Sequence, residues 1–260
     1  MKKYIFLVIS SLFFLYSCNS EKEAAIDLSG EWQFRIDPAD VGEKENWFEL
    51  NFDENIILPG SMVENGKGYD ITLETKWTGG IQNPEWYKDP NYAPYHDPDN
   101  IRFPFWLQPE KKYTGAAWYR KEIFIPKDWS GKPVFLKLER PHWESVVWVN
   151  SSKVDMQNSL ATPHVFNISE FIRKGENSIT IRIDNRTKDI DVGENSHSIS
   201  DHTQSNWNGM IGELTVFAKN TIYFEQVDIF PNAANKAVEI KATVVNTAVE
   251  KASVKIPVSA

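Results

Sequence analysis

The sequence predicts an all-β protein, with an antiparallel β-sandwich followed by an incomplete second β segment. Short runs rich in β-branched and aromatic residues recur along the chain, and helical periodicity is almost absent. Turn-forming clusters, such as residues 127–132 and 173–177, separate these runs. The strands expected on this pattern cover residues 32–36, 117–125, 134–138, 145–149, 164–168, 178–183 and 212–217.

The run at 178–183 is the clearest of these strands. Its three isoleucines, Ile179, Ile181 and Ile183, occupy alternate positions and therefore one face of a strand. We expect that face to lie in the core and the other face to meet water.

Residues 1–17 have the features of a signal peptide. Lys2 and Lys3 precede an apolar run over 4–16, which is shorter than the roughly 20 helical residues that span a bilayer. The run ends in Leu-Tyr-Ser-Cys at 15–18, which resembles the lipobox of bacterial lipoproteins. This implies cleavage before Cys18, lipidation of Cys18, and membrane contact through that lipid only. We therefore expect a protein anchored in the bacterial envelope, on either face of the outer membrane.

The composition narrows the classes of partner and cofactor. Cys18 is the only cysteine, so the chain has no internal disulfide and no cysteine cluster for a metal. The formal net charge of −8 argues against nucleic acid as a partner, because phosphate binding needs concentrated Lys and Arg. No phosphate-binding loop or other cofactor motif is present, so no cofactor is expected.

Residues 18–25 are expected to form a polar tether. Farther along the chain, two segments interrupt the regular succession of strands. Residues 60–108 form a long expected loop with many aromatic residues, including Trp77 and Trp86, and loops of that length in compact domains are usually functional or disordered. The aromatic content favours order, and these indoles are candidates for stacking on sugar rings, with burial in the core as the alternative. Residues 188–208 form a second, polar segment.

The last segment, 220–260, begins a new β unit. Residues 221–231, 237–246 and 252–258 read as three strands, which is too few for a complete sandwich.

Six motifs in order resemble the N-terminal sugar-binding domain of glycoside hydrolase family 2, the family of β-galactosidases, β-glucuronidases and β-mannosidases. They are LSGEWQF at 28–34, LPGS at 58–61, AWYRK at 117–121, WVN at 148–150, TPHVFNI at 162–168, and GEN at 175–177 followed by DN at 184–185. NGMIG at 208–212 resembles the motif that closes the domain, and Ser151 stands where the family usually has Gly. The resemblance covers residues 26–219 and implies a jelly-roll-like sandwich of the galactose-binding-domain type. Residues 220–260 resemble the first strands of the immunoglobulin-like domain that follows in the family, so this segment is expected to be an incomplete immunoglobulin-like unit.

The resemblance implies a role in carbohydrate metabolism rather than an independent enzyme. The family's two catalytic glutamates belong to a (β/α)8 barrel that lies beyond the immunoglobulin-like domain, so no catalytic residue is carried over to this chain. We expect a sugar-binding accessory region of a glycosidase that is inactive alone, with a barrel that is separately encoded or lost. The alternative is a free-standing surface lipoprotein that binds β-linked glycans.

The polar segment before the last expected strand of the sandwich supplies the main sugar-contact candidates, Asp201, His202, Asn206 and Trp207. In the family a loop at this position reaches the edge of the active site, where an acidic residue binds a sugar hydroxyl. Carboxylate and amide groups match sugar hydroxyls, and an indole covers the apolar face of the ring. The alternatives are a cap on the sandwich or a metal site that includes His197, and we expect no metal.

Overall fold

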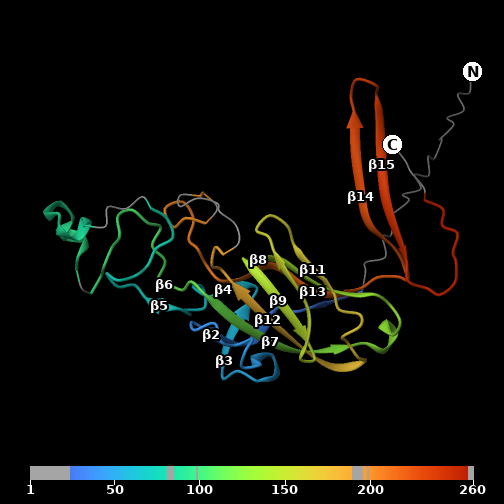
Figure 1. Ribbon diagram of the computed structural model, residues 1–260, viewed down its shortest axis with the longest axis horizontal. Coiled ribbons are helices and arrows are strands. Elements are labelled where there is room, and N and C mark those ends of the chain that lie inside the picture. The colour runs from blue at the N-terminus through green and yellow to red at the C-terminus, as the bar shows by residue number, and fades with distance from the viewer. Residues whose placement is uncertain (1–23, 81–84, 98, 189–195, 198, 257–260) are drawn as a thin grey trace, which may run out of the picture.

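The computed structural model describes residues 24–80, 85–97, 99–188, 196–197 and 199–256, and its main body is two antiparallel β-sheets packed face to face (Figure 1). The six-stranded sheet has, in spatial order, β10 (Ser152–Asn158), β9 (Glu144–Val149), β12 (Gly175–Asp184), β7 (Ala116–Ile125), β2 (Gly30–Asp37) and β3 (Glu54–Leu58). The five-stranded sheet has β1 (Ala25–Asp27), β13 (Gly209–Ala218), β8 (Val134–His142) and β11 (His164–Asn167), with β4 (Gly60–Ser61) paired to β13. The predicted all-β sandwich is confirmed.

The core lies between the two sheets. Ile179, Ile181 and Ile183 of β12 are fully buried there, as their alternation predicted. They pack in one cluster with apolar side chains of β8 and β13 on the facing sheet, which are Val134, Leu136, Leu138, Met210, Leu214 and Val216. Burial at about 25 cal/mol per Å² makes this cluster the main source of the sandwich's stability.

The outer face of β12 is also buried, so the prediction that it meets water is wrong. Thr180 and Arg182, on that face, are only 1% and 4% exposed. Residues 38–53, with the 3-10 helix η1 (Trp47–Glu49), cover this side of the sheet and form a second apolar cluster with Trp118 and Trp148 of β7 and β9. The outward-facing indoles of these two strands supply the apolar surface that the covering segment buries.

One buried carboxylate holds the covering segment on the sheet. Asp37, at the end of β2, accepts hydrogen bonds from the backbone N–H groups of Val41 and Gly42 at 2.9 and 2.8 Å. It also accepts one from Nε1 of Trp118 at 3.1 Å. Gly42 lies so close to that indole that a Cβ there would be 2.5 Å from Nε1, so this position needs glycine.

The expected long loop folds into a lobe, residues 69–108, that extends from one end of the sandwich (Figure 1). It contains β5 (Tyr69–Asp70), which pairs with β6 (Lys111–Lys112), and the 3-10 helices η2 (Trp86–Lys88) and η3 (Pro90–Tyr95). Trp86, Phe103 and Trp106 are buried in a third apolar cluster that belongs to the lobe alone. The lobe therefore has a small core of its own.

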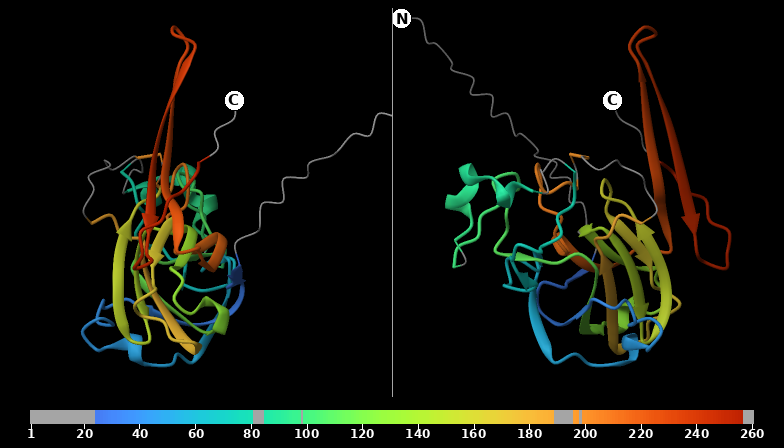
Figure 2. Two further views of the ribbon diagram at one scale, coloured as in Figure 1. Left: turned by 90° about the vertical axis from the view of Figure 1, so that its right-hand side faces the viewer. Right: turned by 60° about the vertical axis from the view of Figure 1, so that its left-hand side comes forward.

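Beyond the sandwich, β14 (Ile222–Asn232) and β15 (Ala237–Asn246) form a two-stranded ribbon that stands clear of the two sheets (Figure 2). These strands match two of the three expected in this segment. The third expected strand, 252–258, is not formed over its described part, 252–256.

The turns between strands agree with their sequences. The 3-10 helix η4 (Lys127–Trp129) lies in the predicted turn at 127–132. Asn150 and Ser151, between β9 and β10, have φ of 49° and 66°, the left-handed region that favours Gly or Asn. Ser151 therefore holds a conformation for which glycine is better suited.

Candidate functional site

Asp201 is the centre of the contacts that join the lobe to the end of the sandwich. Its carboxylate is fully buried, and Nζ of Lys112 donates to both of its oxygens at 2.7 Å. The same carboxylate accepts the backbone N–H groups of Thr78 at 2.7 Å and Asn206 at 2.9 Å. Three donor groups, which make four hydrogen bonds, therefore saturate this carboxylate, and it has no surface open to solvent.

The backbone of Asp201 adds two more bonds to the lobe. Its N–H donates to the carbonyl of Thr78 at 2.8 Å, and its carbonyl accepts from the N–H of Leu107 at 2.8 Å. Thr78 lies near the start of the lobe and Leu107 near its end. One residue of the 201–207 loop thus links both ends of the lobe to the sandwich.

Lys112 compensates the negative charge of the buried Asp201 carboxylate. Its side chain is 6% exposed, and burial lowers its pKa although the charge of Asp201 acts in the opposite direction. Its Nζ also lies 5.6 Å from the centre of the Trp77 ring. Because a buried ion pair gains little net stability but costs much when one partner is lost, this pair sets geometry more than it adds stability.

Three buried asparagines, Asn185, Asn206 and Asn208, hold the loop in place by hydrogen bonds. Asn206 donates through Nδ2 to the carbonyl of Asn185 at 3.1 Å and to Oγ1 of Thr78 at 3.3 Å. Asn208 accepts from the hydroxyl of Tyr119 at 2.8 Å and donates to two backbone carbonyls. These bonds hold the loop at the end of the sheet before β13 begins.

His202 and Trp207 lie on the partly exposed side of the loop. Nδ1 of His202 is hydrogen-bonded to Oγ of Ser200, and its ring lies 6.3 Å from the ring of Trp106 in the lobe. The ring of Trp207 stacks on His142 of β8 at 4.5 Å, and its carbonyl contacts Nδ1 of His142 at 2.6 Å. Burial lowers the pKa of His142, so this ring is held in its neutral form.

The two lobe candidates differ in their surroundings. Trp86 is 3% exposed and belongs to the core of the lobe, where it contacts Phe103 and Tyr92. Trp77 is partly exposed and stacks on Trp106 with the planes 11° apart. Of the six predicted contacts, the structure brings Trp77, Asp201, His202 and Asn206 together at the junction of lobe and sandwich. Trp207 lies beside this junction, and Trp86 lies further along the lobe.

A cavity of about 620 Å³ opens at the same junction. Its walls come from β5, residues 72–78, β6 and the two residues that follow β6. They are Tyr69, Asp70, Thr72, Glu74, Thr75, Lys76, Trp77, Thr78, Lys112, Tyr113 and Thr114. Sequence reasoning missed all of these except Trp77. The recurrence of Thr and Tyr around Trp77, in a segment without strand periodicity, is the signal that was available.

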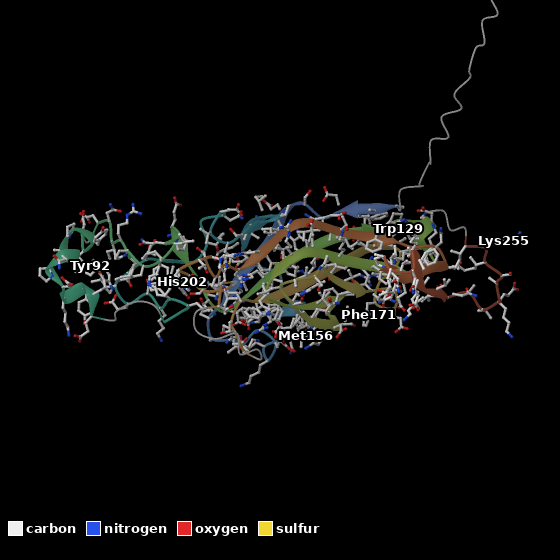
Figure 3. The ribbon with its side chains drawn as sticks, turned by 90° about the horizontal axis from the view of Figure 1, so that it is seen from above. Tyr92, Trp129, Met156, Phe171, His202 and Lys255 are labelled. Atoms are coloured by element: carbon white, nitrogen blue, oxygen red, sulfur yellow. The ribbon has the colours of Figure 1, made fainter. Side chains whose placement is uncertain are left out.

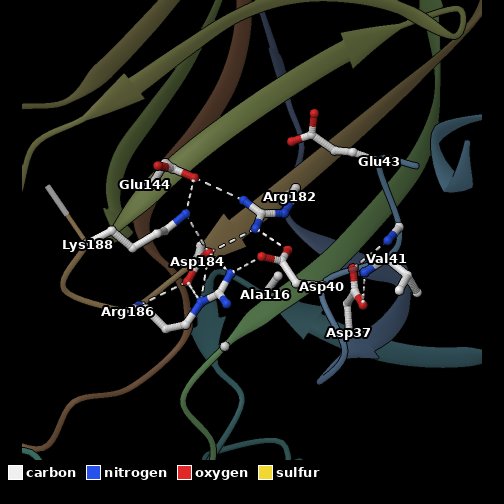
Figure 4. Close-up of polar contacts among 12 residues, drawn as sticks. Asp37, Asp40, Val41, Glu43, Ala116, Glu144, Arg182, Asp184, Arg186 and Lys188 are labelled. Atoms are coloured by element: carbon white, nitrogen blue, oxygen red, sulfur yellow. Dashed lines mark hydrogen bonds and ion pairs between the residues drawn. The ribbon is translucent and has the colours of Figure 1, made fainter. Parts of the chain in front are cut away.

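A network of six charged side chains lies at the start of the polar segment 188–208 (Figure 4). Arg182 contacts the carboxylates of Asp40, Glu144 and Asp184, while Arg186 and Lys188 also bind Asp184. Burial by itself would raise the pKa of Asp184, but the hydrogen bonds from Arg186 and Lys188 outweigh it and hold that pKa far below its usual range. The charges of the three acidic and three basic side chains cancel, so the network has no net charge. Its ion pairs anchor the chain at this point.

The opposite end of the sandwich has a second cavity, of about 570 Å³, between residues 125–133 and 167–174. Figure 3 shows Trp129 and Phe171 of this cavity at the far end of the molecule from His202 and Tyr92. None of the predicted contact residues lines it.

Two further expectations concern metal binding and membrane crossing. Within the described ranges, no cluster of three His, Cys, Asp or Glu side chains is arranged to hold a metal. In the same ranges, no helix combines the length and the apolarity that crossing a bilayer requires. Cys18 and the expected signal peptide at 1–17 lie outside the described residues.

Comparison with known proteins gives one family. The family model described as the glycosyl hydrolases family 2 sugar binding domain matches residues 26–220. The β-glucuronidase of Paenibacillus borealis is 24% identical over 160 residues, which cover 61% of this chain and 21% of that protein. The β-galactosidase of Thermoanaerobacter pseudethanolicus is 34% identical over 94 residues, which cover 35% of this chain and 13% of that protein. The chain thus spans about a fifth or less of these relatives.

Solved structures with the same fold include two β-glucuronidases. That of an uncultured Clostridium species has a TM-score of 0.60 and 17% identity, over 88% of this chain and 35% of its own. That of Ruminococcus gnavus has a TM-score of 0.56 and 18% identity, with the same coverage. At such identities the likeness establishes the fold alone.

Proposed function

The chain belongs to glycosyl hydrolase family 2 through its sugar-binding domain, as its motifs predicted, and from that premise we propose that it recognises β-linked glycans at the junction of lobe and sandwich. The observation that carries this proposal is the arrangement around Asp201. One buried residue connects the 201–207 loop with both ends of the aromatic lobe, so candidate residues distant in sequence face one region.

The chemistry of this region suits carbohydrate. Sugars present paired donors and acceptors at their edges and apolar C–H groups on their faces, and they bind where hydroxyl, amide and aromatic groups converge. His202 and Trp207 are partly exposed on the loop, while Asp201 and Asn206 are buried behind them. We assign the direct contacts to the exposed pair and the positioning of the loop to the buried pair.

Binding is tested by exchanging the stacked ring. Trp207→Ala removes an aromatic surface that is worth about 1 kcal/mol in ring stacking, so binding on a glycan array should weaken by about fivefold or more. Phe124→Ala is the matched control, because Phe124 is 62% exposed on β7 and belongs to no candidate site. Equal binding by both variants would remove Trp207 from the site.

We further propose that this 260-residue chain does not hydrolyse glycosides by itself. Retaining glycosidases need two carboxyl groups about 5 to 5.5 Å apart and free to react with the sugar. The buried acids near the candidate site, Asp184 and Asp201, are saturated by cations and N–H donors. Homogeneous protein incubated with nitrophenyl β-glycosides should release no nitrophenol, and turnover that survives purification would contradict the proposal.

The second candidate function is a free-standing surface lipoprotein that binds glycans, and the lobe favours it. With a core of its own around Trp86, the lobe presents Tyr87 and Tyr95, which are 48% and 40% exposed, to solvent. Under this proposal the protein is anchored through Cys18 in the bacterial outer membrane. Cys18→Ala should then abolish labelling by palmitate and release the protein from the membrane fraction, whereas labelled mutant protein would refute lipidation. Glycan binding by intact cells would support the surface location.

A further inference from the structure

We propose that the cavity formed by β5, β6 and residues 72–78 is a sugar subsite of its own, which takes one uncharged pyranose ring. The proposal rests on the proposed function, because it deepens glycan recognition at the junction of lobe and sandwich. Its location is separate from the partly exposed face of the 201–207 loop. The cavity, at about 620 Å³, is in the size range of small-molecule sites and has ample room for one ring.

The hydroxyl groups that line this cavity are arranged to donate. Oγ1 of Thr75 accepts the N–H of Thr72 at 2.8 Å, Oγ1 of Thr72 accepts the N–H of Glu74 at 3.3 Å, and Oγ1 of Thr78 accepts Nδ2 of Asn206. Within the described residues none of these three hydroxyls has an acceptor for its own proton. A ligand rich in oxygen atoms would supply those acceptors.

Aromatic side chains provide the remaining walls. Tyr69 is 52% exposed, and its ring is tilted against the buried Tyr113 at 5.9 Å, which leaves much of Tyr69 open to a ligand. Trp77 forms another wall. A pyranose has both a hydroxylated edge and an apolar face, and this combination of threonines and aromatic rings matches both.

Charge selects an uncharged sugar. The walls carry two carboxylates, Asp70 and Glu74, and two ammonium groups, Lys76 and Lys112. Asp70 is paired with Lys111 at 2.5 Å, and Lys112 is paired with Asp201. Together with their partners Lys111 and Asp201, the walls carry three carboxylates and three ammonium groups, so the net charge around the cavity is zero. A neutral site of this kind gives an anion no net electrostatic attraction, which favours an uncharged ring.

Two buried polar atoms beside the cavity also lack partners in the described part of the chain. They are Nε1 of Trp77, a donor, and Oδ1 of Asn206, an acceptor. Unpaired buried polar atoms are rare in folded proteins and call for an explanation. Pairing with the hydroxyls of a ligand, after small side-chain shifts on binding, would satisfy both.

The experiment uses the full chain with methyl β-D-galactoside and methyl β-D-glucoside as uncharged probes, and sodium glucuronate and inorganic phosphate as anionic probes. Binding is followed by saturation-transfer NMR and isothermal titration. At least one uncharged probe should bind in preference to both anions. Tyr69→Ala should weaken that binding by about tenfold, and Thr72→Val by about threefold, the loss of one hydrogen bond. Thr243→Val, on the exposed polar face of the ribbon, is the control and should bind like the wild type.

The outcomes separate this subsite from the broader function. Glycan binding that Trp207→Ala abolishes while Tyr69→Ala and Thr72→Val leave it unchanged would overturn the subsite and preserve the proposed function. Preference for glucuronate or phosphate would overturn the assignment of an uncharged ring. No binding by the wild type to any probe or array glycan would overturn both. Tyr69→Phe, which keeps the ring and removes only the hydroxyl, should bind within about threefold of the wild type, which would show that the ring makes the main contact.

Discussion

Replacing Lys112 tests whether the Lys112–Asp201 ion pair holds the lobe on the sandwich. Lys112→Met keeps the length and apolar bulk of the side chain but leaves the carboxylate of Asp201 buried with only two backbone donors, the N–H groups of Thr78 and Asn206. Removing one partner of a buried pair costs about 3 to 5 kcal/mol. Because two donors remain, we expect about 3 kcal/mol, which lowers the melting temperature by roughly 6 to 12 °C for a domain of this size.

The neighbouring lysine provides the matched control. Lys111 forms an ion pair with Asp70, whose side chain is 85% exposed, and exposed pairs contribute about 0 to 1 kcal/mol. Lys111→Met should therefore melt within about 3 °C of the wild type. The double change Lys112→Met with Asp201→Asn removes both charges and should recover part of the lost stability.

Melting followed by calorimetry, together with amide hydrogen exchange, separates local from global effects. In Lys112→Met the amides of Thr78 and Leu107, which bond to Asp201, should exchange faster, while those of β12 should keep their protection at temperatures well below melting. Equal melting temperatures for the Lys111 and Lys112 variants, or unchanged exchange at Thr78 and Leu107, would refute the role assigned to this pair.

Three further changes have predicted outcomes. Burial lowers the pKa of both His142 and His164, so the unfolded chain binds more protons than the folded chain. Stability is therefore lost as the pH falls below about 6.5, and a melting temperature that stays constant from pH 7.5 to 5.5 would contradict this. Gly209→Ala should lower the free energy of unfolding in urea by about 2 kcal/mol or more, since Gly209 has φ of 143° and an added Cβ would lie 2.5 Å from the carbonyl oxygen of Gly60. An unchanged free energy of unfolding would show that β4 moves freely. Asp37→Ala leaves three donors unpaired and should destabilise the protein by about 3 kcal/mol, with faster exchange over residues 38–53 as the diagnostic sign.

The sandwich followed from sequence because its signals are local. Alternation of β-branched residues placed Ile179, Ile181 and Ile183 in the core, and turn chemistry separated the strands. The covered outer face did not follow from sequence. Trp47 covers Trp118 and Phe48 covers Trp148, and these contacts span about seventy to a hundred residues, a separation that no local periodicity records. The aromatic content of the lobe predicted that it is ordered and not disordered. Its short strands were not predicted, because a strand of two residues is too short to show alternation of apolar and polar residues.

The candidate site was predictable in its chain position and not in its geometry. The polar segment 201–207 contains groups suited to sugar, and the structure places it at an end of the sandwich beside the lobe. The burial of Asp201 depends on Lys112, which is 89 residues away in sequence and reads as one of two adjacent surface lysines. Pairing across such a separation depends on the register of β5 with β6 and is invisible in the sequence itself.

The central claim, that this domain recognises glycans at the junction of lobe and sandwich, is tested most directly by mapping protection from hydrogen exchange on the full chain with and without a saturating glycan from an array screen. Protection confined to residues 69–78, 111–114 and 201–207 is the predicted result. Protection at residues 125–133 and 167–174, around the cavity at the opposite end, would contradict the account, as would failure of every glycan to change the exchange of any segment.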